Sequence, residues 1–339
     1  MIGFLEKLAK YPRVLRGFAA TATIAVVLFL IDNFLIYVLG WPGIGRFFTH
    51  LGVFTPDKTF KGLQGSAITQ GWIQFLAFTV VFVLALVWVR RTSFRSLIHD
   101  AGLYSAIAAF IVRAAFWSVL LVGGVDMLLS FLRVEGFLPA IIGADLTTQL
   151  GRSIFRGTWV HYPLIGIAIV IALLSRSLGF IWLALMIVGA EFLIVITRFV
   201  FSYEQAFMGD LVRFWYAALF LFASAYTLLH DGHVRVDVLY AGFTKRGKAV
   251  TNSIGSLLLG LPICWTILIL GTSSRGSIIV SPLLSFEISQ SGYGMYTKYL
   301  MAGYLMIFAL SMAIQFVSLF LSNMAEFAED SDHLVNGSN

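Results

Sequence analysis

Long apolar stretches recur along the chain, and segments that contain Gly, Pro or charged residues separate them. Eight of these stretches are long enough to cross a bilayer as a helix: residues 17–39, 71–89, 101–125, 159–175, 178–200, 211–230, 251–272 and 296–322. A transmembrane helix needs about 20 mainly apolar residues, because the hydrocarbon core of a bilayer is about 30 Å thick. The pattern therefore predicts an all-α polytopic membrane protein with about eight transmembrane helices.

Residues 126–158, between the third and fourth predicted spans, fit neither a span nor a plain loop. Arg152 and Arg156 follow a series of apolar residues at helical spacing, namely Leu138, Ile141, Ile142, Leu146 and Leu150. A helix of this kind can lie flat in the membrane interface, and a loop packed over helix ends accounts for the pattern equally well. The segment is therefore a candidate interfacial helix.

The composition agrees with a membrane protein and excludes an ordinary soluble domain. Apolar side chains make up 59% of the residues and charged side chains 12%, and the mean hydropathy is +0.90. Soluble domains carry roughly 25% charged residues. The chain has one cysteine, Cys264, which excludes an internal disulfide and a cluster of thiolates around a metal.

The positive charges predict the orientation of the spans. If the N-terminus lies in the cytoplasm, the segments on that side contain twelve Lys and Arg residues, and the segments on the other side contain eight. Cytoplasmic loops are enriched in Lys and Arg, so we expect an N-in/C-in arrangement. The net charge of +6 is spread over short loops without a basic block, which argues against a nucleic-acid partner.

Some charged residues fall inside predicted spans, and the candidates for intramembrane charges among them are Asp32, Arg113, Glu191 and Arg198. A charge in the hydrocarbon region is costly and indicates a function or a specific packing partner. Glu191 and Arg198 lie two helical turns apart, about 10 Å along the axis, so we expect each to pair with another helix or with a partner protein. An ion pathway through Asp32, Arg113 and Glu191 is the alternative, and it would make the chain an autonomous carrier or channel.

No pattern in the chain predicts catalysis or a bound cofactor. The sequence lacks the G-x-x-x-x-G-K-[ST], G-x-S-x-G and H-E-x-x-H motifs. All six histidines fall in loops or at span ends, where they cannot hold a haem inside the bundle. His230 and His233 with Asp231 are a weak metal signal, because no further Cys or His lies nearby. We expect no enzyme activity, metal or cofactor; a membrane anchor for another complex is a third interpretation.

A run of eleven residues after the sixth span is more specific, and it reads His230-Asp231-Gly232-His233-Val234-Arg235-Val236-Asp237-Val238-Leu239-Tyr240. Two shorter strings precede it: Arg198-Phe199 and Asp210-Leu211-Val212-Arg213-Phe214-Trp215. Together they resemble the DctQ family, the small membrane (permease) subunit of the tripartite ATP-independent periplasmic (TRAP) transporters. The resemblance covers about residues 178–328, and the family usually has Glu at the position of Asp210.

The resemblance implies a four-helix subunit of the bacterial inner membrane, without catalytic residues of its own. In this family the subunit scaffolds a large elevator-type permease that carries the substrate and sodium sites. A periplasmic binding protein delivers an organic anion or a similar small solute for secondary active uptake by symport. The motif or interface residues that the resemblance assigns are His230, Asp231, Gly232, His233, Arg235, Asp237, Asp210 and Arg213.

The eleven-residue run also has a physical interpretation of its own. Asp231-Gly232 supplies a turn where the sixth span reaches the cytoplasmic interface. Basic residues at that depth suit lipid phosphates or the acidic groups of a partner. Candidate contacts for phospholipid headgroups are therefore His233, Arg235 and Lys245.

The resemblance divides the chain into three parts. Residues 1–176 are an N-terminal membrane extension with about four spans, residues 177–328 are a DctQ-like four-helix domain, and residues 329–339 are a polar tail. Typical family members lack such an extension. We expect it to add membrane-buried surface and an outer docking platform, joined to the DctQ-like domain by a tight turn at residues 175–177.

Overall fold

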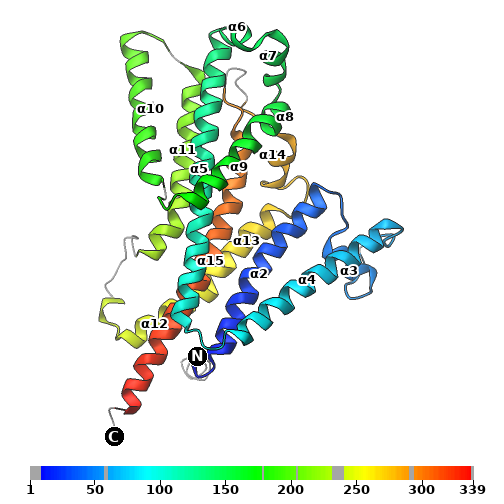
Figure 1. Ribbon diagram of the computed structural model, residues 1–339, viewed down its shortest axis with the longest axis vertical. Helices are drawn as coiled ribbons and strands as arrows, with labels where there is room; N and C mark the ends of the chain where they lie inside the picture. Colours follow the sequence, from blue (N-terminus) through cyan, green and yellow to red (C-terminus); the bar gives the residue numbers. More distant parts are fainter. Residues whose placement is uncertain are drawn as a thin grey trace. The chain divides into compact units, whose positions relative to one another are not determined.

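The computed structural model describes residues 9–56, 60–177, 179–203, 205–230, 240–289 and 294–336. Its regular elements are helices, and the described residues contain no strand. The α-helices (Figure 1) are α2 Pro12–Tyr37, α3 Gly43–His50, α4 Ser66–Arg91, α5 Leu97–Val134, α6 Leu138–Ile142, α7 Ala144–Leu150, α8 Ser153–Arg156, α9 Tyr162–Leu174, α10 Phe180–Val200, α11 Ala206–Leu229, α12 Lys245–Gly255, α13 Leu261–Gly271, α14 Val280–Ser285 and α15 Lys298–Asn336.

All eight predicted spans are confirmed as helices long and apolar enough to cross a membrane. Six of them lie within a single helix, namely α2, α4, α5, α10, α11 and α15. The other two, Ser153–Leu174 and Lys245–Gly271, each join α-helical segments through a π-helical turn, at Gly157–His161 and Ser256–Gly260. The chain is therefore an all-α polytopic membrane protein.

The third span is longer than the sequence pattern indicated. Helix α5 runs from Leu97 to Val134, whereas the apolar pattern ended at residue 125. The next residue is Asp126, whose carboxylate is fully buried and paired within the protein, so the helix continues past it. The rest of the candidate interfacial segment is divided into the short helices α6, α7 and α8. Gly143, with φ +84°, separates the first two of these, because a positive φ interrupts a helix.

Packing divides the chain into two compact units. Unit 1 comprises Met1–Ser105, Val234–Trp265 and Ala313–Asn339, and unit 2 comprises Ala106–His233 and Thr266–Met312. Each unit thus combines residues from both sides of the predicted boundary at residue 176. The division of the sequence at residues 176 and 328 stays a prediction.

Unit 1 contains the packing of α2 against α4. Arg16 on α2 is buried and pairs with Asp100, in the first turn of α5, at 2.6 Å. The same guanidinium donates to the carbonyl of Thr92, the residue that follows α4, at 2.7 Å. Because basic groups satisfy the free carbonyls at a helix C-terminus, Arg16 connects three helices of the unit.

Unit 2 has an aromatic core in which α11 contacts α5 and the first part of α15. Phe222 on α11 packs edge-on against Phe116 of α5, and Phe214 lies 5.4 Å from the ring of Tyr304 on α15. The indole of Trp215 donates to the carbonyl of Val119 at 3.2 Å. Gly123 permits this approach, since a Cβ at that position would clash with the indole ring. The helices that hold the polar sites described next are therefore closely packed.

Candidate functional site

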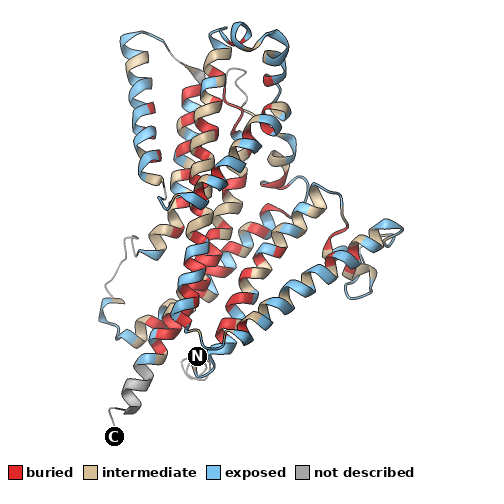
Figure 2. Cartoon of the chain, viewed as in Figure 1, coloured by how far each residue is buried: buried red, intermediate tan, exposed pale blue. Residues whose placement is uncertain are grey.

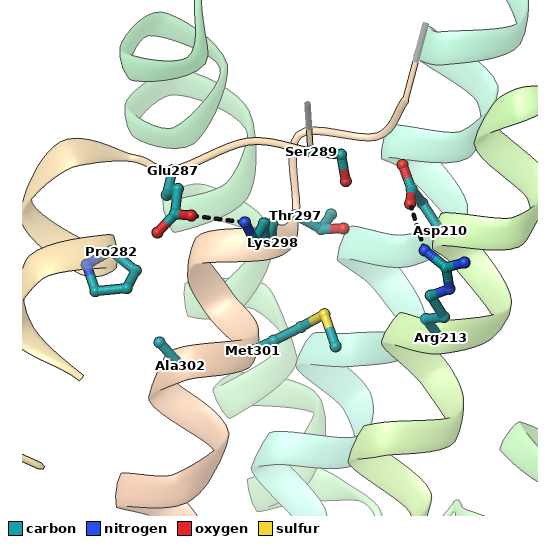
Figure 3. Close-up of a pocket in the computed structure, with 9 residues that line it drawn as sticks. All are labelled: Asp210, Arg213, Pro282, Glu287, Ser289, Thr297, Lys298, Met301 and Ala302. Atoms are coloured by element: carbon teal, nitrogen blue, oxygen red, sulfur yellow. Dashed lines mark hydrogen bonds and ion pairs between the residues drawn. The ribbon is translucent and has the colours of Figure 1, made fainter. Parts of the chain in front are cut away.

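A pocket of about 700 Å³ in unit 2, called the charged pocket below, contains both Asp210 and Arg213 of the predicted motif (Figure 3). These two residues come from α11, and the other walls come from α14, the segment after it and the start of α15. The lining residues are Asp210, Arg213, Pro282, Glu287, Ser289, Thr297, Lys298, Met301 and Ala302.

Two ion pairs of different strength lie in the charged pocket. The ammonium of Lys298 and the carboxylate of Glu287 are 2.6 Å apart, and both side chains are about half exposed. Arg213 is only loosely paired with Asp210, at 3.9 Å, and its side chain is 79% exposed. The carboxylate of Asp210 is better held, since it also accepts the backbone N–H of Met295 at 3.2 Å. Figure 3 shows the two pairs on different sides of the pocket, with Met301 between them.

The charged pocket therefore presents two cations and two anions to whatever enters it. Arg213 and Asp210 share a face because residues three apart on a helix are neighbours. The sequence offered no comparable signal for Glu287 and Lys298, which are ordinary charges in a loop and at a helix start. A pocket with this balance suits a zwitterion, or a partner surface that carries both signs of charge.

Unit 2 contains a second group of polar residues, called the Asp126 cluster below, which no local pattern in the sequence indicated. Asp126 on α5 accepts from Arg156 and from Nε2 of His161 through one oxygen, at 3.0 Å each. Its other oxygen accepts the backbone N–H of Tyr296 at 2.8 Å. Because a carboxylate only accepts hydrogen bonds, Nε2 of His161 carries a proton. Nδ1 of the same ring, when the ring is neutral, then accepts a hydrogen bond from the hydroxyl of Tyr299 at 2.9 Å.

The Asp126 cluster is fully buried and joins distant parts of the sequence. The side chains of Asp126, Arg156 and His161 are each 0% exposed. They belong to the predicted N-terminal extension, whereas Tyr296 and Tyr299 belong to the DctQ-like part. Buried charges are tolerated only when paired and hydrogen-bonded. The cluster therefore binds the extension to the DctQ-like part inside one compact unit.

Two of the four candidate intramembrane charges named from the sequence, Asp32 and Arg113, have local partners. Asp32 accepts from the backbone N–H of Ile44 at 3.0 Å and from the side-chain amide of Gln74, so it links α2 to α3 and α4. Arg113 on α5 donates to the carbonyl of Ala172, near the C-terminal end of α9, at 2.9 Å. These contacts give both charges a structural reason to lie in a span.

Glu191 and Arg198 differ from that pair, because both are exposed on α10 and neither forms an ion pair with another residue that the structure describes. Helix α10 buries only Leu183, Ile187 and Ala190, and most of it is exposed (Figure 2). The two charges share one exposed stripe, called the α10 stripe below, at helical spacing: Val188, Glu191, Val195 and Arg198.

The eleven-residue run is only partly described. His230 follows the last residue of α11, and its Nδ1 lies 3.0 Å from the carbonyl of Tyr226. Lys245 is exposed at the first position of α12. The remaining motif residues lie outside the described part of the chain: Asp231, Gly232, His233, Arg235 and Asp237.

Residues 185–326 match the family described as the DctQ component of tripartite ATP-independent periplasmic transporters. No curated protein and no solved structure matches the chain. The matched range includes the whole charged pocket and the α10 stripe. Four of the eight candidate spans precede the fifth, Phe180–Val200, in which the match begins.

Proposed function

We propose that this chain, which carries a DctQ domain of the TRAP transporters at residues 185–326, is the small membrane subunit of such a transporter in the bacterial inner membrane. In this role it scaffolds a large elevator-type permease. That partner holds the substrate and sodium sites, and it takes up an organic anion or a similar small solute by symport. A periplasmic binding protein supplies the solute, and this chain contributes neither catalysis nor a cofactor.

The α10 stripe is the observation that supports a scaffold role. Glu191 lies near the middle of α10, and a charge at the centre of a transmembrane helix costs about 2.5–3.5 kcal/mol when it faces lipid. Arg198 lies near the end of the helix, where a long side chain can reach the interface. A partner helix that pairs with Glu191 removes the larger of these costs, so we assign the α10 stripe to the contact with the large permease.

The test is co-purification of the large permease with the variant Glu191→Leu. We expect this variant to recover less permease, because it loses the paired carboxylate, while the isolated chain becomes no less stable. The matched control is Val195→Leu, on the same exposed stripe, which changes an apolar side chain without removing a charge. The assignment would be refuted if Glu191→Leu recovered as much permease as Val195→Leu and the unchanged chain do.

A further inference from the structure

An apolar cavity of about 170 Å³ lies in unit 2, and the charged pocket is lined by residues adjacent in sequence to those of the cavity. Phe214 follows Arg213 on α11, Leu283 follows Pro282 on α14, and on α15 Leu300 and Gly303 flank Met301 and Ala302. The charged pocket and the apolar cavity therefore occupy neighbouring surfaces of α11, α14 and α15. One is charged and the other is almost wholly apolar.

One of the residues that line the apolar cavity carries a buried hydroxyl. Tyr304 lines it and is 3% exposed, and its hydroxyl has no hydrogen bond to any residue that the structure describes. Leaving a buried hydroxyl unsatisfied is costly, and the other lining residues are nearly all apolar. A ligand that brings an acceptor, such as an ester carbonyl, next to an apolar chain would satisfy both features.

The charged groups and Tyr304 follow one another along the spans in the order in which a phospholipid has its headgroup and its acyl chains. Lys298 is the first residue of its candidate span, and Arg213 lies in the second turn of its own. Tyr304 lies six residues beyond Lys298, which is about 9 Å further along the helix. The charged pocket is therefore placed at headgroup level, and the cavity at the level where the acyl chains begin.

We propose that the charged pocket and the apolar cavity together bind one phospholipid with a zwitterionic headgroup and a primary ammonium, as in phosphatidylethanolamine. Arg213 and Lys298 face its phosphate, and Asp210 and Glu287 accept hydrogen bonds from its ammonium. The two carboxylates disfavour a purely anionic headgroup. The first few methylene groups of one acyl chain enter the cavity, whose volume of about 170 Å³ is close to the ~150 Å³ of an apolar cavity that binds benzene.

The headgroup arm of the test uses native mass spectrometry of the purified full-length chain with added lipids. We expect phosphatidylethanolamine to be retained about tenfold better than phosphatidylglycerol or phosphatidylcholine. Arg213→Gln should weaken that retention by about tenfold, because it removes a charge-assisted bond to the phosphate. Arg213 is exposed, so this variant keeps the fold. The control is Arg152→Gln, which alters another exposed arginine of unit 2.

The acyl-chain arm uses Gly303→Leu, whose side chain would enter the cavity, where Leu283 is the single neighbour within 4 Å of the added Cβ. Its control is Gly166→Leu, at a position of α9 with open space around it. Retention should fall for Gly303→Leu and stay unchanged for Gly166→Leu. Equal retention of all three lipids, equal retention by Arg213→Gln and Arg152→Gln, or equal binding of soluble phosphoethanolamine would each overturn the proposal.

Discussion

Replacing Asp126 by Leu is expected to destabilise the protein strongly, because the carboxylate is the common acceptor of three buried donors. These are the guanidinium of Arg156, Nε2 of His161 and the backbone N–H of Tyr296, at 3.0, 3.0 and 2.8 Å. A buried donor without a partner costs about 1–3 kcal/mol, so three give roughly 3–9 kcal/mol before the structure relaxes. Removing one member of a buried ion pair costs about 3–5 kcal/mol. We expect a loss in that second range.

The assay is unfolding of the purified chain in mixed micelles, with the free energy of unfolding measured against increasing denaturing detergent. The control Asp145→Asn alters an exposed carboxylate on α7 that forms no ion pair with a described residue, and it should change that free energy by less than about 0.5 kcal/mol. The double variant Asp126→Leu with Arg156→Met should recover much of the loss, because no buried charge is then left unpaired. If Asp126→Leu and Asp145→Asn have the same free energy of unfolding, the Asp126 cluster does not stabilise the fold.

Three further predictions concern the extension, the orientation and the scaffold role. A chain that begins at Arg176 lacks the partners of Tyr296 and Tyr299, so it should be purified in lower yield and unfold at lower temperature; stability equal to that of the full chain would show that the extension is a separate body. Reporter fusions should place Lys245 and Asn339 in the cytoplasm and residues 58 and 143 outside, and a cytoplasmic signal at residue 143 would contradict the predicted topology. Calorimetry on the isolated chain should detect no sodium-dependent solute binding, whereas stoichiometric binding would favour an autonomous carrier.

The number and position of the spans could be predicted from the sequence alone. Hydropathy is a property of short windows, and a stretch of about 20 apolar residues has few alternatives to a transmembrane helix. Asp210 and Arg213 were also named from the sequence, through the resemblance to the DctQ family, and residues three apart on a helix share a face whatever surrounds it. The resemblance to the DctQ family rested on contiguous strings in the same way.

Only the tertiary structure decided which polar groups meet. The end of the third span was misplaced because Asp126 lowers the local hydropathy, while its burial depends on Arg156 and His161, which lie 30 and 35 residues away. Glu287 and Lys298 also line the charged pocket, but no local pattern in the sequence indicates that their segment approaches α11. The cost of a buried charge is set by the partners that packing supplies. Local hydropathy therefore determined the spans of this protein, and packing between residues distant in sequence determined its polar sites.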